Sequence, residues 1–259
     1  MLNESLREKI LRGLAAQEGK VGFYYRDLVS GETLGWHADE SFLAASVIKL
    51  PIFMYLAKLD AEGALSLSER VKVREADKVP ICGALPLFTD EPECDLRTLC
   101  NLMISLSDNT ATNVLIERLG IEAYNRGFRE MGLKKTVLQR KLFDATASAT
   151  GKENRVVPEE MGMLLEQVYR REFVNPQVSE MILDTLLLQQ INHKLGGVIG
   201  YRYEIAHKTG EDDGISNDVG IVFSEKPFIA CFLGNETDVF KWENFIRVTA
   251  GELAGIAID

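Results

Sequence analysis

The chain has 259 residues, with 39 Asp or Glu against 29 Lys or Arg, a formal charge of −10 and an isoelectric point near 5.0. This acidity argues against a nucleic-acid partner, because phosphate binding needs a basic surface. No run reaches the roughly 18 apolar residues of a membrane span, so we expect no membrane partner. With 46% hydrophobic residues, the chain suits one large domain or two interleaved ones.

Residues 1–20 are charged and amphipathic, without the apolar core and cleavage pattern of a secretory signal. As written, the sequence predicts a cytoplasmic protein, or a secreted mature domain if an export signal has been removed. The cysteines (Cys82, Cys94, Cys100 and Cys231) form no CxxC pair and have no His at ligand spacing, so we expect no metal and no cofactor. Cys94 and Cys100 could bridge, but free thiols are favoured for a cytoplasmic chain.

The first expected element is a helix, because Leu6, Ile10 and Leu14 recur at helical spacing. Residues 21–28 and 33–36 are then expected to form a hairpin around a Ser-Gly turn. From residue 46 to about 200 the periodicity is almost entirely helical. Strand character returns at 201–207, 218–223 and 228–233, and residues 239–253 predict a closing helix.

This order of elements is not the strand–helix alternation of a parallel sheet. It predicts an α/β protein of the α+β type, in which both chain ends form an antiparallel sheet flanked by helices. We place the sheet domain at residues 1–45 and 200–259, and an inserted all-helical domain at 46–199. An active site is expected at the seam between the two, a common location for small-molecule sites.

The first motif with catalytic potential is Ser46-Val47-Ile48-Lys49, the only S/T-x-x-K match in the chain. Lys49 falls one helical turn after Ser46, on the same face of an apolar run. A serine hydroxyl needs a nearby base to become a nucleophile, and a desolvated lysine that loses its proton can be that base. The helix N-terminus adds partial positive charge where an oxyanion would develop.

The second motif is Ser107-Asp108-Asn109, which follows the apolar stretch 96–106. Its serine can relay a proton to a leaving nitrogen, and its asparagine amide can hold Lys49 and contact a substrate amide. The alternative interpretation is a helix N-cap, for which Ser, Asp and Asn are the preferred residues.

The third motif is Lys208-Thr209-Gly210, which we expect to close the strand that ends at His207. A cation and a hydroxyl can hold a substrate carboxylate, and the glycine lets a substrate lie close to the strand edge. The backbone N–H of Glu211 can point at an oxyanion. The alternative is a plain strand end before an acidic loop. We interpret His207 as a strand histidine with its outer nitrogen in solvent, although it could tune Lys208.

The motifs S-x-x-K, S-D-N and K-T-G, in this order, resemble those of the penicillin-recognising serine enzymes, class A β-lactamases in particular. The resemblance covers nearly the whole chain. Residues 105–120 (SLSDNTATNVLIERLG) resemble the family's central helix–loop–helix, and 208–223 (KTGEDDGISNDVGIVF) resemble its strand–turn–strand. It implies a class A β-lactamase-like fold and a serine hydrolase that forms an acyl-enzyme with β-lactams or D-alanyl-type amides and esters.

The resemblance also implies a role for each residue of the first two motifs. Ser46 would be the acylated nucleophile and Lys49 its base. Ser107 would pass a proton to the leaving nitrogen, and Asn109 would contact the side-chain amide of the substrate.

The third motif would bind the rest of the substrate. Lys208 and Thr209 would anchor the substrate carboxylate beside Gly210. The backbone N–H groups of Ser46 and Glu211 would form the oxyanion hole. A small-molecule substrate is then the expected partner of a monomeric protein.

Two positions depart from the class A pattern. Alignment on Arg140 or on Asn154 puts Leu142 or Lys141 where these enzymes carry the glutamate that activates the deacylating water, and neither can act as that base. Asp144 is the nearest carboxylate and a candidate base, although a hydrogen bond that braces the loop is the alternative.

The second departure lies beside the K-T-G strand, where many class A enzymes use an arginine. Ser216 occupies that position and is a candidate substrate-binding residue, with Arg202 as a more distant substitute.

The missing glutamate predicts an acyl-enzyme that forms readily and hydrolyses slowly, as in penicillin-binding proteins of the class A fold. A D-alanyl peptidase or a general amidase therefore competes with a β-lactamase. A non-hydrolytic module that is acylated once, or that binds a D-amino-acid peptide, shares every motif and lacks only turnover.

Overall fold

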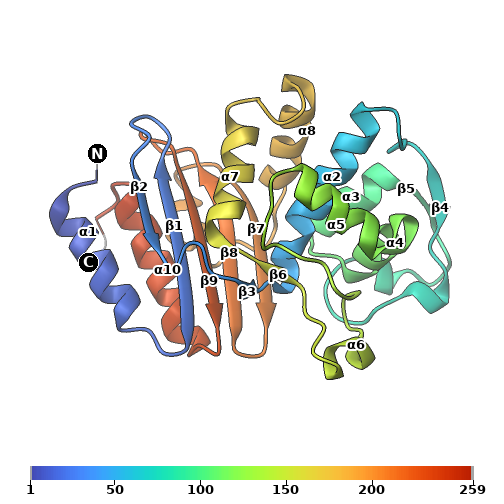
Figure 1. The fold of residues 1–259 in the computed structure, drawn as a ribbon, viewed down its shortest axis with the longest axis horizontal. Coiled ribbons are helices and arrows are strands. Elements are labelled where there is room, and N and C mark those ends of the chain that lie inside the picture. The colour runs from blue at the N-terminus through green and yellow to red at the C-terminus, as the bar shows by residue number, and fades with distance from the viewer. Residues whose placement is uncertain (1, 258–259) are drawn as a thin grey trace.

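The computed structural model describes residues 2–257, and its centre is an antiparallel sheet built from both ends of the chain (Figure 1). The sheet has five strands in the order β2-β1-β9-β8-β7. This confirms the predicted fold class. The strands are β1 (Lys20–Asp27), β2 (Thr33–Trp36), β7 (Ile205–Asp212), β8 (Ile215–Val222) and β9 (Phe228–Asn235).

Helices from the two termini cover one face of this sheet. Asn3 caps α1 (Glu4–Ala15), since its side chain accepts the N–H of Leu6, and α1 buries Ile10 and Leu14. The closing helix α10 (Val239–Leu253) buries Trp242 and Ile246 in the same cluster. The two helices lie side by side at one end of the molecule (Figure 1).

The other lobe is built around α2 (Lys49–Ala61), in which every residue from Lys49 to Ala57 is buried. A helix that is apolar on all sides belongs in a core, and Figure 1 shows α2 among the other helices of this lobe. These helices are α3 (Leu96–Ser105), α4 (Asn109–Leu119), α5 (Ile121–Glu130), α6 (Ala145–Ala149) and α8 (Pro176–Leu187). The short α9 (Gly196–Ile199) instead packs against α10.

The segment 46–199 is not all-helical, which corrects the prediction in two ways. It contains short strands, because two or three residues are too few to leave a period in the sequence. In addition, α7 (Pro158–Tyr169) packs on the second face of the sheet, against β1, β8 and β9. The short elements of this segment are β4 (Arg70–Lys72) paired with β5 (Glu93–Asp95), the 3₁₀ turns η2 (Glu75–Asp77) and η3 (Leu85–Leu87), and β6 (Arg155–Val156). β6 pairs with β3 (Phe42–Leu43), which lies just before the segment.

The first strand after the helical segment starts later than predicted. β7 begins at Ile205 and ends at Asp212, so the K-T-G motif lies within the strand and does not close it. The tight turn at Asp213-Gly214, with Gly214 at φ 65°, connects β7 to β8. An Asp-Gly pair is typical of a tight hairpin turn, which explains why β7 and β8 extend closer to each other along the chain than predicted.

The cysteines at 82, 94, 100 and 231 are free thiols. Among residues 2–257, no helix is both long and apolar enough to cross a bilayer.

Candidate active site

A cleft of about 710 Å³ opens between the sheet and the helical lobe, at the predicted seam. Ser46, Asn109 and Glu211 line it, so residues from all three motif regions reach one hollow. Its other walls are Leu43, Ala45, Ile81, Cys82, Arg140, Leu142, Phe143, Asp144, Ala145, Ser148, Glu153, Asn154, Asp212, Asp213 and Ile215.

Ser46 lies in a single 3₁₀ turn, η1 (Ala45–Ile48), directly before α2. Ala45 takes a positive φ of 41°, an uncommon conformation for a residue with a side chain. Such backbone conformations cluster at functional sites. Within the part of the chain that the structure describes, the Ser46 hydroxyl makes no hydrogen bond, and it is partly exposed to the cleft.

Lys49 is fully buried at the start of α2. Its Nζ lies 2.7 Å from the Ser107 carbonyl oxygen, 3.0 Å from Ser107 Oγ and 2.7 Å from Asn109 Oδ1. Burial lowers the pKa of Lys49 well below the usual lysine value, and the nearby charge of Lys208 lowers it further. A neutral amine held this way is suited to act as a base.

In the Ser107-Asp108-Asn109 motif, the N-cap interpretation holds for Asp108, and Asn109 makes the predicted contact with Lys49. Asp108 is the N-cap of α4, since its Oδ1 accepts the N–H of Ala111 at 2.9 Å. Ser107, at φ 54°, and Asn109 instead direct their side chains to Lys49. The capped turn therefore fixes the geometry of the two residues that flank it.

Lys208 approaches the same serine from the sheet. Its Nζ donates to Ser107 Oγ at 3.1 Å and to the Thr209 carbonyl oxygen at 2.8 Å. Burial lowers the pKa of Lys208 to about 7, and the neighbouring charge of Lys194 contributes to the shift. Ser107 Oγ thus lies between two lysines, where it can accept from one and pass a proton to the other.

Gly210 brings β7 against the start of η1. A Cβ at this glycine would lie 2.9 Å from the Ala44 carbonyl oxygen and 3.0 Å from the Ser46 nitrogen. The next residue, Glu211, lines the cleft on an edge strand, whose outer backbone groups have no partner strand. The role of the N–H groups of Ser46 and Glu211 as the oxyanion pair stays a prediction.

Alignment leaves two candidates for the glutamate position, Leu142 and Lys141, and their side chains lie in different surroundings. Leu142 lines the cleft, and its N–H and C=O are both held by the Asn113 side chain, at 2.8 and 3.0 Å. Lys141 points away and pairs with Glu117 at 2.6 Å. Of these two candidates for the position of the class A glutamate, Leu142 is the one that lines the cleft.

The carboxylates in this loop are already engaged. Asp144 caps α6, accepting the N–H of Ala147 at 2.9 Å, so it makes the bracing hydrogen bond that was the alternative to a base. Glu153 accepts two bonds from Arg140, at 2.8 and 2.9 Å, and one from Ser148. Burial alone would raise the pKa of Glu153, but these bonds lower it overall.

Ser216 does not reach the cleft, contrary to the sequence-based expectation. It pairs with Glu211 across the β7–β8 ladder, and its hydroxyl donates to Glu243 of α10 at 2.9 Å. Its side chain therefore lies on the face of the sheet covered by α10. His207 also differs from expectation, because it is fully buried and bonded at both ring nitrogens.

The sequence did not identify the loop that forms the wall opposite β7. Ile81 and Cys82 line the cleft, and the Ile81 carbonyl accepts the Asn109 amide N–H at 2.9 Å. Both take positive φ values, 71° and 61°, and Gly83 follows at 104°. The Cys82-Gly83 pair was the only local signal, and it does not indicate a site.

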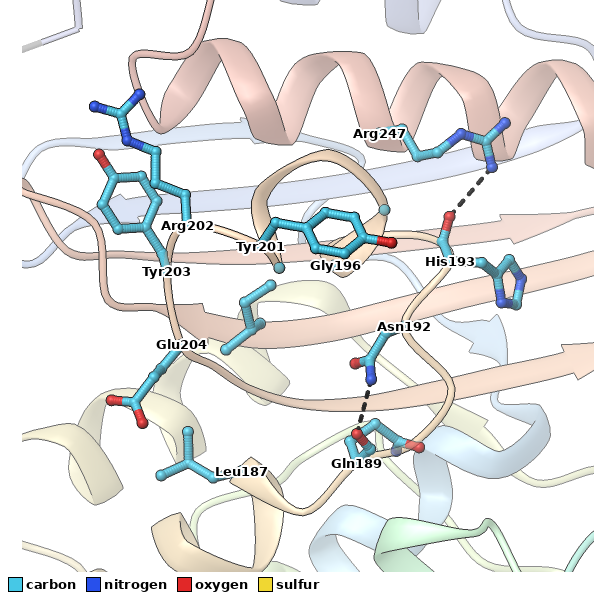
Figure 2. A pocket seen from close by; sticks show the side chains of 13 residues that line it. Leu187, Gln189, Asn192, His193, Gly196, Tyr201, Arg202, Tyr203, Glu204 and Arg247 are labelled. Atoms are coloured by element: carbon cyan, nitrogen blue, oxygen red, sulfur yellow. Dashed lines mark hydrogen bonds between the residues drawn. The ribbon is translucent and has the colours of Figure 1, made fainter.

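A second hollow of about 1000 Å³ lies at α9, α10 and the start of β7 (Figure 2). Arg202, the distant substitute for an arginine beside K-T-G, lies here, with its guanidinium 5.5 Å from the Tyr203 ring centre. It is therefore absent from the wall of the catalytic cleft. Asn192 and Arg247 line other sides of this hollow.

The antiparallel sheet, the helical insert and the Ser–Lys–Ser–Asn–Lys constellation at their seam define a serine enzyme of the β-lactamase type. Residues 5–250 match the model of the Beta-lactamase enzyme family, and the chain belongs to that family. A β-lactamase from Rhodobacter capsulatus is 29% identical over 248 residues, covering 91% of this chain and 82% of that protein.

Two solved structures show the same fold along the chain. The β-lactamase from Sphaerobacter thermophilus DSM 20745 is 26% identical with a TM-score of 0.87, and the match covers 100% of both chains. The structure of PBP-A is 28% identical with a TM-score of 0.87, covering 97% of this chain and 95% of that one.

Proposed function

We propose that β-lactams and D-alanyl-type amides or esters acylate this enzyme at Ser46, and that the acyl-enzyme hydrolyses slowly. The observation that carries the acylation step is the buried Lys49, whose Nζ is fixed by Ser107 and Asn109 one helical turn after the nucleophile. Its lowered pKa favours the neutral amine, the form that a general base needs.

In the proposed step, the Ser46 proton moves to Lys49 as Oγ attacks the substrate carbonyl carbon. The new C–O bond to Ser46 forms, and the C–N bond of an amide or β-lactam, or the acyl C–O bond of an ester, breaks. The leaving nitrogen or oxygen takes a proton from Lys49 through the Ser107 hydroxyl. Lys208 and Thr209 hold the substrate carboxylate. Backbone N–H groups at the contact between η1 and β7 stabilise the oxyanion, a contribution of about 3 kcal/mol per donor in acyl-transfer enzymes.

Slow deacylation follows from Leu142. Hydrolysis of the ester needs a base to activate water, and an apolar side chain at that position cannot supply one. The nearby carboxylates of Asp144 and Glu153 are occupied by the bonds described above. Among the structural relatives, a leucine-to-glutamate mutant of PBP-A was solved as an acyl-enzyme complex with penicillin G.

The test is fluorescent-penicillin labelling followed by a chase with unlabelled penicillin. We expect labelling of the wild-type protein, no labelling of Ser46→Ala, and a label that persists for many minutes. Leu142→Glu should shorten the lifetime of the label, whereas the matched Leu142→Gln, which has the same shape without the carboxylate, should not.

Release of the wild-type label within seconds would contradict slow deacylation and identify a true β-lactamase with another base. Failure of the folded protein to label would contradict the β-lactam substrate. Turnover of a D-alanyl ester with a trapped penicillin adduct would favour a peptidase, and acylation without any turnover would favour the non-hydrolytic binding module.

A further inference from the structure

His207 lies immediately behind the K-T-G motif, inside the protein. Its ring Nδ1 is 2.9 Å from Asp218 Oδ1 and its Nε2 is 2.8 Å from Asn192 Oδ1. Both His207 and Asp218 have fully buried side chains. Gly220, directly opposite His207 on β8, leaves it room, since a Cβ there would lie 2.5 Å from His207 Cβ.

The two partners of the ring are both hydrogen-bond acceptors. The Asn192 amide is oriented by its own Nδ2, which donates to the Gln189 carbonyl at 3.0 Å, the dashed line beside Gln189 in Figure 2. Its oxygen must therefore face His207. On the other side, the second oxygen of Asp218 accepts the N–H of Leu195 at 3.0 Å.

A neutral imidazole has one N–H and one lone pair, and only the imidazolium donates from both nitrogens. If Asp218 is ionised and the ring is neutral, one ring nitrogen has a lone pair where a donor is needed. That lone pair faces either Asn192 Oδ1 at 2.8 Å or the Asp218 carboxylate at 2.9 Å. Two buried acceptors that face each other without a hydrogen between them destabilise the fold by about 1–3 kcal/mol. A second proton on the ring satisfies both contacts.

We propose that His207 is a buried imidazolium paired with Asp218, and that it serves as a positioning residue for Lys208. Its charge neutralises Asp218, the carboxylate bonded to its ring, so that this anion does not balance Lys208. Lys208 is then available to bind the carboxylate of a substrate. The catalytic part of this inference rests on the proposed function, whereas the charge of His207 does not.

The other charges around His207 come from the loop before α9 and from the end of β7. Lys194, fully buried, pairs with Glu211 at 2.7 Å. His193 lies 3.5 Å from Glu211 and 3.4 Å from Glu243. Glu211 is thus paired with Lys194, and Asp218 is the carboxylate bonded directly to the His207 ring.

The charge is tested by ¹⁵N NMR of the histidine rings. The chain has only three histidines, so His37→Gln and His193→Gln assign the signals. At about pH 7.5, a unit above the ordinary histidine value, we expect nearly equal shifts for the two nitrogens of His207, the imidazolium signature. Widely separated shifts, including those of a neutral ring beside a protonated Asp218, would overturn the proposal.

The positioning role is tested by the pH profile of penicillin acylation in His207→Gln. The amide can still donate to Asp218 but leaves its charge uncompensated, which favours the charged form of Lys208. The alkaline limb of the profile should move up by about one pH unit, and His37→Gln should leave it in place. A uniform loss of rate with an unmoved limb would show a merely structural role. A protein that fails to label at all, with the imidazolium signal present, would count against the proposed function and leave the charge assignment intact.

Discussion

Lys49 and Lys208 are two buried lysines that share one hydroxyl, that of Ser107. Sequence spacing alone placed Lys49 beside Ser46, because three residues along a helix return to the same face. It could not place Lys208, which arrives from a strand about 160 residues away in the chain. The resemblance of the K-T-G motif to that of the family placed Lys208 at the site.

At this scale, the base is tested by Lys49→Met, an unbranched apolar replacement that suits a buried position. We expect the second-order rate of penicillin labelling to fall by about 10²–10⁴, the usual contribution of a general base. Thermal denaturation should show that the variant still folds cooperatively. Labelling within tenfold of the wild-type rate would rule out Lys49 as the base.

The lysine pKa values also predict a pH dependence. Lys49, with a depressed pKa, stays an active base as the pH falls below the usual lysine range. Lys208 carries its charge below a pKa of about 7 and loses it above. Acylation efficiency at low concentrations of a carboxylate-bearing β-lactam should therefore decline above about pH 7, since such rates report the free enzyme. A neutral ester substrate is the control, and an equal decline for both would contradict the role of Lys208.

At the scale of elements, the contact between β7 and η1 sets the geometry of the oxyanion site. Gly210→Ala would push a methyl group against Ala44 and Ser46. Displacements of about 1 Å can cost about 10²-fold in rate, so we expect a loss of that order in acylation. Gly63→Ala is the matched control: it lies at φ 70° in open space, so it should cost about 1 kcal/mol of stability with acylation unchanged. Equal acylation rates for the two variants would contradict the account.

Elements with a clear period were predictable, whereas faces and burial were not. The helix at Leu6–Leu14 and the hairpin strand Thr33–Trp36 followed from local pattern. Ser216 was assigned to the cleft from the position of the class A arginine, but its face depends on the register of β8 against β7, and one residue of shift reverses every side chain. His207 was expected in solvent because its partners Asn192 and Asp218 belong to other segments.

At the scale of the whole molecule, one apolar core joins both lobes. Phe53 and Leu99 of the helical lobe share a cluster with Ile221 and Leu233 of the sheet. Lys208 of β7 also donates to the Ser107 hydroxyl of the helical lobe, at 3.1 Å. The site at the seam is therefore held by contacts that neither lobe makes alone.

This continuity predicts a single unfolding transition. Trp36 and Trp242, the two tryptophans of the chain, both lie with the sheet, whereas most helical residues lie in the other lobe. Tryptophan fluorescence and far-UV circular dichroism should therefore give the same urea midpoint, as two-state unfolding requires. Separate midpoints would show that the lobes are independent and that the seam is weaker than its contacts indicate.

The central claim, acylation of Ser46, is tested most directly by intact-mass spectrometry after brief exposure to penicillin G. The account predicts a gain of one whole penicillin molecule, because ring opening expels no fragment, and a peptide map that places the gain on Ser46. The adduct should still be present many minutes later, and Ser46→Ala should gain nothing. An unmodified wild-type mass with intact drug in solution, or an adduct on any other residue, would contradict it.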